Sequence, residues 1–200
     1  MRLVLRGTAR LAAMVVFSLF LAACETPPSQ NNFAEITFGH LPEIKLNVGE
    51  IVYESRYKAP ETLPNVDHVF PVPPARAAER WAHDRLRAVG SDNKAVFILK
   101  DASVTEEHLA TKGGIKGAFT TEQTERYKAR MDVEIQIVDN FGNALSNITA
   151  NVERTTTTPE DLSLREREKV WFRLTEDVMR DLDMQLDPAI KRVFFPYLTF

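Results

Sequence analysis

The chain has 200 residues, 44% of them hydrophobic, which is enough for one domain with its own core. It carries 25 basic and 28 acidic residues, and a net-acidic chain is a poor candidate for binding the phosphate backbone of nucleic acids. A single cysteine, Cys24, excludes an intrachain disulfide and zinc sites built from several cysteines. Stability must therefore come from packing.

The first 24 residues have the pattern of an export signal. An apolar run over residues 11–21 follows a basic start and is followed by Ala22 and Ala23, two small residues directly before Cys24. These are the parts of a secretory signal peptide. A membrane span needs about 20 apolar residues, so this run, about half that length, predicts a cleaved signal and not a transmembrane anchor.

The tetrapeptide Leu21-Ala22-Ala23-Cys24 resembles the lipobox of bacterial lipoproteins. The resemblance covers the first two dozen residues only. It implies that a diacylglycerol is joined to the Cys24 thiol, that the peptide is cut between Ala23 and Cys24, and that the new amine is acylated. Lipid chains of this kind attach a protein firmly to a membrane without any membrane-spanning helix.

We expect three parts: a signal peptide over 1–23, a lipidated N-terminus with a flexible polar tether over 24–32, and a single domain over 33–200. The signal holds three arginines and no acidic residue, so the remainder carries 22 basic and 28 acidic residues, a net charge of −6. Such a chain gains nothing electrostatically from an anionic membrane surface, and the lipid must do the anchoring.

The domain begins with alternating apolar residues. The pattern over residues 44–53 predicts one strand with a bulge at Gly49, and the dense prolines between residues 60 and 74 predict an extended loop. Pro74 is suited to a first helical turn, and Gly90 to the position after the last one. Between them an apolar stripe predicts a helix with Trp81 in the core: Ala78, Trp81, Ala82, Leu86 and Val89.

The middle of the chain predicts a sheet. The apolar run within residues 94–104 is typical of a buried strand, and the polar stretch 101–112 is expected to hold one helical turn. Residues 127–138 alternate strictly between apolar and polar, and residues 144–156 alternate again after a turn-forming cluster at 139–143. This pattern predicts an antiparallel hairpin with one wet face.

The last predicted element is a long helix. Ser163 and Glu166 have capping-box spacing, and an apolar stripe follows them. Pro188 is expected to break the helix, and a short second helix is expected to hold Ile190 and Val193. The order of elements predicts an α+β fold, with an antiparallel-rich sheet of about four strands covered on one face by two helices.

No residue pattern points to catalysis. The histidines lack the spacing of a helical metal pair, and no serine-hydrolase elbow is present. We read them as surface residues: His40, His68, His83 and His108. We therefore expect no catalytic residues, no metal and no cofactor.

The C-terminus is aromatic, and its Phe195, Tyr197 and Phe200 are the candidate partner-binding residues. Two readings are open: this tail packs back on the domain, or it forms an exposed apolar patch that docks a partner.

The element order resembles small α+β envelope lipoproteins, such as the auxiliary lipoproteins of lipid-transport ABC systems and the lipopolysaccharide-assembly lipoprotein. The resemblance is architectural and implies no particular binding residues. It implies a membrane-anchored periplasmic lipoprotein that is a non-enzymatic binding or adaptor subunit in envelope assembly or transport, with an envelope protein as partner and no nucleic acid. The alternatives are a lipid or small-ligand carrier and an envelope hydrolase with a dispersed site. Glu25, which follows the lipidated cysteine, favours the outer over the inner membrane.

Overall fold

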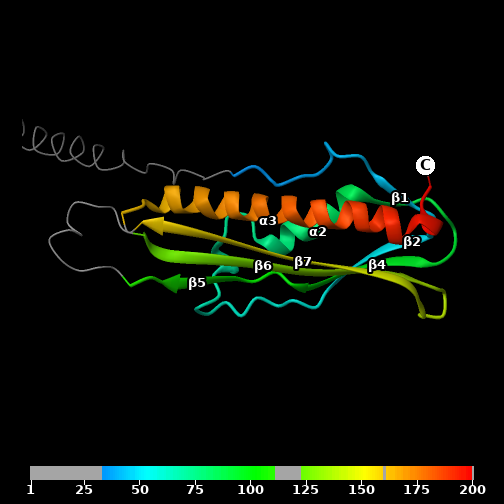
Figure 1. Cartoon of the computed structure of the whole chain (residues 1–200), viewed down its shortest axis with the longest axis horizontal. Coiled ribbons are helices and arrows are strands. Elements are labelled where there is room, and N and C mark those ends of the chain that lie inside the picture. Colours follow the sequence, from blue (N-terminus) through cyan, green and yellow to red (C-terminus); the bar gives the residue numbers. More distant parts are fainter. Residues whose placement is uncertain (1–32, 111–122, 160, 200) are drawn as a thin grey trace, which may run out of the picture. The chain divides into compact units, whose positions relative to one another are not determined.

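Two sixteen-residue strands, β6 (Gln123–Val138) and β7 (Ala144–Pro159), form the longest strand pair of the fold. The computed structural model describes residues 33–110, 123–159 and 161–199. Figure 1 shows the two strands running side by side along the domain. On β6 every second side chain from Tyr127 to Ile137 is fully buried, so the period-two alternation of the sequence is confirmed.

The remaining strands of the main sheet lie on the side of β6 that faces away from β7. Strands β4 (Lys94–Asp101) and β5 (Val104–His108) pair antiparallel with successive parts of β6. Strand β2 (Glu50–Ser55) pairs in parallel with β4. This sheet therefore has five strands and is mostly antiparallel, as predicted, with β2, β5 and β7 at its edges.

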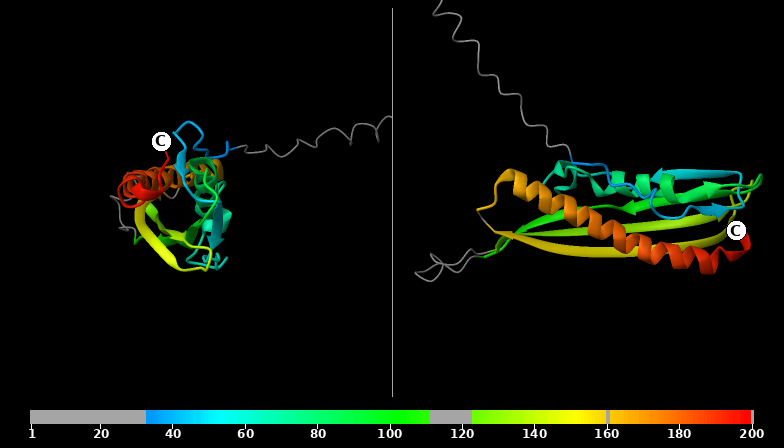
Figure 2. Two further views of the ribbon diagram at one scale, coloured as in Figure 1. Left: turned by 90° about the vertical axis from the view of Figure 1, so that its right-hand side faces the viewer. Right: turned by 90° about the horizontal axis from the view of Figure 1, so that it is seen from above.

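Two helices, α2 (Pro74–Arg85) and α3 (Leu164–Val193), cover one face of this sheet (Figure 2). Trp81 of α2 packs on Phe97 of β4, with ring centroids 5.8 Å apart, and Trp171 of α3 meets the edge of Tyr127 on β6 at 5.7 Å. Phe97 pairs with Ile135, which lies on the same face of β6 as Tyr127, so both helices lie on that face. The α+β prediction and the core position of Trp81 are confirmed.

The start of α3 has the predicted capping box. The backbone N–H of Glu166 donates to the Ser163 hydroxyl at 3.3 Å, and the backbone N–H of Ser163 donates to the Glu166 carboxylate at 3.0 Å. Two single-turn 3₁₀ helices complete the described elements, η2 (Asp67–Val69) and η4 (Phe195–Tyr197). Within the described ranges, neither α-helix combines the length and apolar character that crossing a membrane requires.

The single strand expected over residues 44–53 is wrong. Its first part is β1 (Ile44–Leu46), which pairs in parallel with β3 (Leu86–Ala88) in a separate two-stranded sheet, and its second part is β2 of the main sheet. Gly49 lies between them without a bulge. A Cβ there would stand 2.8 Å from the carbonyl oxygen of Ser91, so the glycine permits a close crossing of two backbone segments.

The first helix ends at Arg85, not at Gly90. Leu86 continues the helical spacing of the apolar stripe, but its backbone pairs with Ile44 in the β1–β3 ladder. The stretch 101–112 holds strand β5 and not a helical turn, because residues 104–108 pair with β6. Both errors concern pairings with residues far away in the sequence.

Pro188 does not break the second helix, and the predicted short second helix is the last part of α3. A proline in a helix loses the hydrogen bond to the carbonyl four residues back, here that of Met184. Both Pro188 and Met184 are exposed, so water can satisfy that carbonyl. Leu186 and Ile190 on the opposite side are fully buried, and each contributes about 1.5–3 kcal/mol of burial, which offsets a proline cost of about 3 kcal/mol.

Candidate functional site

The C-terminal segment packs on the domain and leaves one aromatic side chain exposed. The N–H of Asn47 donates to the Tyr197 carbonyl at 2.7 Å, and the N–H of Thr199 donates to the Lys45 carbonyl at 3.0 Å. Tyr197 is half-buried, whereas the Phe195 side chain is 63% exposed. The tail therefore packs on the domain at Tyr197 and leaves Phe195 exposed, and the docking of a partner by Phe195 stays a prediction.

The other candidate residues of the sequence lie outside the described part of the chain. They are Phe200, the signal-cleavage residue Ala23 and the lipidation residue Cys24. Their roles stay predictions.

Four of the exposed large apolar side chains lie on elements at one end of the domain. The β6–β7 turn and the C-terminal end of α3 both lie at the right-hand end of Figure 1. The turn and the strand after it carry Phe141, 91% exposed, and Leu145; the helix end carries Val193 and, just beyond it, Phe195. We call these four residues the apolar end. Sequence reasoning missed the first two, although an aromatic residue within the polar turn 139–143 was a visible signal.

The N-terminal segment, residues 33–43, runs over both helices. Phe33 stacks on Phe172 of α3 with ring centroids 5.3 Å apart. The backbone N–H of Phe38 donates to the Asp84 carboxylate of α2 at 2.8 Å. Phe33, the first described residue, therefore lies on the helical face of the domain.

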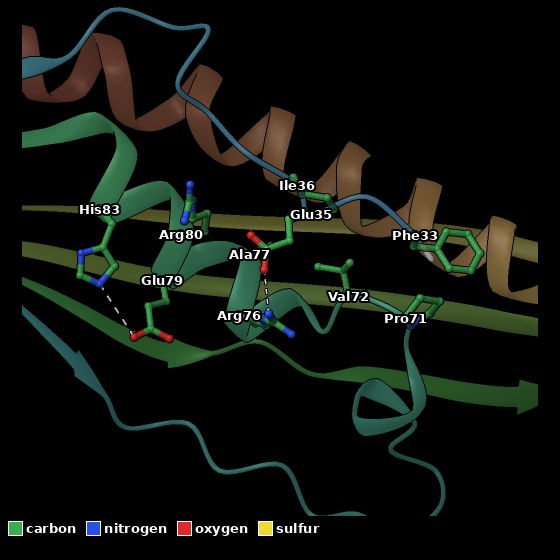
Figure 3. A pocket seen from close by; sticks show the side chains of 10 residues that line it. All are labelled: Phe33, Glu35, Ile36, Pro71, Val72, Arg76, Ala77, Glu79, Arg80 and His83. Carbon is green, nitrogen blue, oxygen red and sulfur yellow. Dashed lines mark hydrogen bonds and ion pairs between the residues drawn. The ribbon is translucent and has the colours of Figure 1, made fainter. Parts of the chain in front are cut away.

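Two open hollows flank this segment. One of about 460 Å³ lies between the segment and α2, and Figure 3 shows Ile36 and Val72 facing it among charged side chains such as Arg76. Another, of about 540 Å³, lies toward α3 and is lined by Phe172 and Met184 among others. Both are within the range of about 300–1,000 Å³ that is usual for small-molecule sites.

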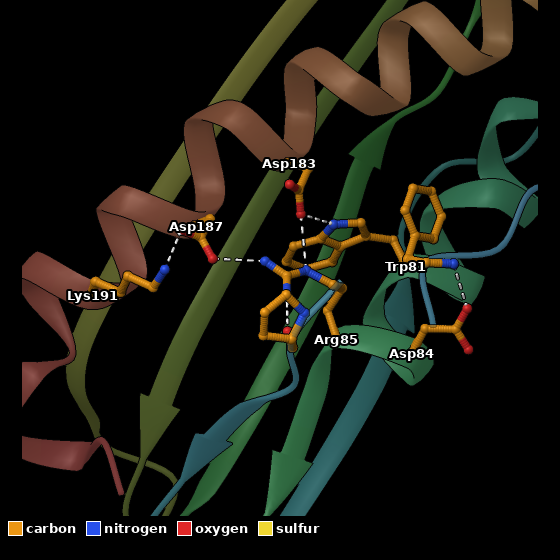
Figure 4. A network of polar contacts seen from close by, with 8 residues as sticks. Trp81, Asp84, Arg85, Asp183, Asp187 and Lys191 are labelled. Carbon is orange, nitrogen blue, oxygen red and sulfur yellow. Dashed lines mark hydrogen bonds and ion pairs between the residues drawn. The ribbon is translucent and has the colours of Figure 1, made fainter. Parts of the chain in front are cut away.

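A buried arginine joins the two helices beside this segment (Figure 4). The Arg85 side chain is 3% exposed; its Nε donates to Asp183 at 3.0 Å, a terminal nitrogen donates to Asp187 at 2.7 Å, and the other reaches the Pro42 carbonyl. The Trp81 indole N–H also donates to Asp183, at 2.8 Å. Every charged group of this network has a partner, as burial of charge requires.

One set of side chains in the described ranges could supply three metal ligands. Glu106, His108 and Glu125 lie on one face of β5 and β6, and one ligand atom of each lies within 4.8 Å of the others. The Glu125 carboxylate already accepts from the Tyr127 hydroxyl at 2.7 Å and pairs with Arg167 of α3 at 3.0 Å. Burial and this hydrogen bond raise the pKa of Tyr127 far above its ordinary value. The cluster therefore joins the start of α3 to the sheet.

The four histidines are exposed, as predicted. His83 lines the hollow beside α2 and lies 3.9 Å from Glu79, and His108 lies 3.8 Å from Glu106. His40 lines the hollow beside α3.

Comparison with known proteins gives low similarity only. No protein-family model and no curated protein matches the chain. Among solved structures, a minor lipoprotein from Acinetobacter baumannii is similar with a TM-score of 0.39 and 14% identity, over 78% of this chain and 98% of that one. The rare lipoprotein B from Shewanella oneidensis is similar with a TM-score of 0.35 and 16% identity, over 71% and 97% of the two chains.

Proposed function

We propose that this chain is a membrane-anchored periplasmic lipoprotein whose domain binds another envelope protein and catalyses no reaction itself. The observation that carries the proposal is the apolar end. Phe141 and Phe195 are 91% and 63% exposed, whereas the other aromatic residues of the described ranges are buried or half-buried. Exposed aromatic side chains at one end of a domain are candidates for a protein interaction site.

The predicted lipid anchor supports the same proposal. Lipid on Cys24 would hold the domain close to a membrane, and eight further residues up to Asn32 reach about 25–30 Å when extended. The partner would then be a protein at or near that membrane, and Glu25 favours the outer membrane as its location.

The interior of the domain argues against a carrier that holds its ligand between sheet and helices. Within the described ranges, the side chains that face each other there are fully buried and fill that space: Trp81, Phe97, Tyr127, Met131, Met179 and Leu182. The carrier remains the second candidate because of the two hollows beside the N-terminal segment. Lipid found by mass spectrometry in the purified chain, and lost in Phe172→Ala, would favour it.

The proposal is tested by a double variant, Phe141→Asp with Phe195→Asp, in cells that express the full-length chain. Chemical crosslinking followed by affinity purification should recover one envelope protein with the wild type and at least tenfold less of it with the double variant. Leu164→Asp is the matched control, because Leu164 is 68% exposed at the other end of α3, where a helix start tolerates an acidic residue. Equal recovery with all three chains would refute the role of the apolar end.

A further inference from the structure

Strand β7 has one side without a strand partner. It pairs with β6 alone, and no strand within residues 33–110, 123–159 or 161–199 lies on its other side. The Asn151 carbonyl accepts from the Gln185 side chain of α3 at 3.3 Å, so the backbone groups of Asn151 point away from β6. By the period of two, the N–H and C=O groups of Glu153, Thr155 and Thr157 point the same way.

This edge has only part of the usual protection against pairing. Proteins guard edge strands with charged side chains, above all lysine, with proline, bulges or short length, or by covering the edge with a helix or loop. Strand β7 is sixteen residues long, has no lysine, has its only proline at position 159, and keeps one register with β6 from Thr158 to Ser146. Its two charged residues, Glu153 and Arg154, are paired within the chain with Lys128 and Asp181. The opposite edge strand, β2, is six residues long and has two glutamates, at its first and fifth positions.

A helix stands beside the open edge and forms a groove with it. Helix α3 crosses the strands at an angle (Figure 2). Between β7 and α3 lie a hollow of about 280 Å³, lined by Thr155, Thr157 and Leu174 among others, and one of about 310 Å³, lined by Glu153 and Met184 among others. Strand β7 forms one wall of this groove and supplies backbone donors and acceptors. Helix α3 forms the other wall and supplies apolar and polar side chains.

We propose that residues 153–159 of β7 bind an extended strand of the partner protein, which adds to the sheet beside α3. This inference rests on the proposed function and names its second contact surface. Addition of a strand to an exposed sheet edge is a recurring mode of peptide recognition, in which backbone hydrogen bonds give affinity and the flanking pocket selects side chains. Seven residues of β7 span about 24 Å, at about 3.4 Å per residue, which is the length of an ordinary strand.

The charges beside the edge define the chemistry of the partner strand. Arg154 pairs with Asp181, and Asp177 pairs with Arg180 at 2.6 Å, so these four charges are already matched within the chain. Arg173 also lines the hollow, and among the described residues its side chain donates to the Lys169 carbonyl at 3.3 Å and pairs with no carboxylate. The partner strand therefore has small uncharged residues, such as threonine, serine or valine, on the side that faces Leu174, and an acidic residue fits that side only beside Arg173.

A second copy of the chain has access to only part of this edge. Pairing two complete β7 strands would need the backbone of Asn151, whose carbonyl is already bound by Gln185 where α3 lies over the edge. Residues 153–159 are open to a second copy as they are to a partner strand, and the crosslinking experiment below distinguishes the two.

The test uses the register that strand pairing imposes. A photoreactive amino acid is placed singly at Glu153, Thr155 or Thr157 of the full-length chain in living cells, and the crosslinked residue of the partner is identified by mass spectrometry. We expect one partner protein, whose crosslinked residue moves by two positions for each two-residue step along β7. Crosslinks to one fixed residue, to unordered positions, to β7 of a second copy, or to lipid alone would overturn the inference.

The second arm of the test asks whether binding depends on the backbone N–H groups of β7. Thr155→Pro removes an outward N–H, whereas Thr155→Ala keeps it, and prolines are tolerated on edge strands. With the photoreactive group at Thr157, we expect the proline variant to lower the crosslink yield at least tenfold and the alanine variant to keep it within twofold. Both variants are first checked for an unchanged melting temperature, and if Thr155→Pro melts early, Thr157→Pro replaces it with the group at Glu153. Equal yields from the proline and alanine variants would refute strand addition.

The two proposals fail separately. A partner that crosslinks from Phe195 but not from β7 overturns this inference and leaves the proposed function standing. A chain that crosslinks to no protein from either surface contradicts both.

Discussion

Replacing Arg85 by methionine should strongly destabilise the domain. The Arg85 side chain is 3% exposed, and its partners Asp183 and Asp187 are 19% and 24% exposed. Removing the cation leaves the Pro42 carbonyl without its donor, Asp183 with only the Trp81 indole N–H, and Asp187 with only the exposed Lys191. Breaking a buried ion pair in this way costs about 3–5 kcal/mol, and the partial exposure of both carboxylates places the expected loss near 3 kcal/mol.

Thermal unfolding monitored by circular dichroism, with urea unfolding for the free energy, measures this loss. In a domain of this size each kcal/mol shifts the melting temperature by about 2–4 °C, so we expect a decrease of about 6–12 °C. The control is Arg76→Met on the same helix, because the Arg76 side chain is 66% exposed and its pair with Glu35 should contribute less than about 1 kcal/mol. Adding Asp183→Asn and Asp187→Asn to Arg85→Met should restore part of the stability. A loss below 1 kcal/mol for Arg85→Met would refute the reasoning.

Two further predictions concern pH and the anchor. Hydrogen bonds from Gln136 and Lys100 hold the pKa of Glu134 below its ordinary value of 4.5, so this group stabilises the fold above that pH and loses its contribution as the pH falls through the lower folded value. Melting temperatures measured from pH 7 to 3 should therefore fall below about pH 4.5, and less steeply in Glu134→Gln; parallel curves would contradict this. Cys24→Ala should move the chain from the membrane pellet to the soluble fraction of lysed cells, and a variant that stays in the pellet would exclude the lipid as the anchor.

The features that the sequence predicted correctly are those set by local chemistry. Alternation along β6, the serine and glutamate of the capping box, and the proline at the start of α2 each act within a few residues of their own position. The hydrophobic stripe of α2 also identified Trp81 as a core residue. Local patterns of this kind depend on one element alone, so they are readable without knowing what lies beside it.

The features that the sequence did not predict depend on distant partners. The sequence spacing of Leu86 fits the apolar stripe of a helix, but its backbone pairs in a strand. That secondary structure depends on Ile44, more than forty residues earlier. Gly49 could mark a bulge or a crossing, and only the position of Ser91 decides between them. In each case the local sequence is compatible with two structures, and a contact made elsewhere in the fold selects one.

The apolar end and the open edge of β7 also depend on distant partners, so the sequence did not predict them. Phe195 and Tyr197 are neighbours in an aromatic tail, yet pairing of the tail with β1 half-buries Tyr197 and leaves Phe195 exposed. Likewise residues 155–158 of β7 are four consecutive threonines, a β-branched run that suits any strand, and nothing in them shows that no strand follows on the far side. Whether an edge is open depends on the order of strands in the sheet. The strand-addition groove follows from that order, because β7 is last in it and α3, returning over the sheet, leaves the C-terminal half of its edge accessible.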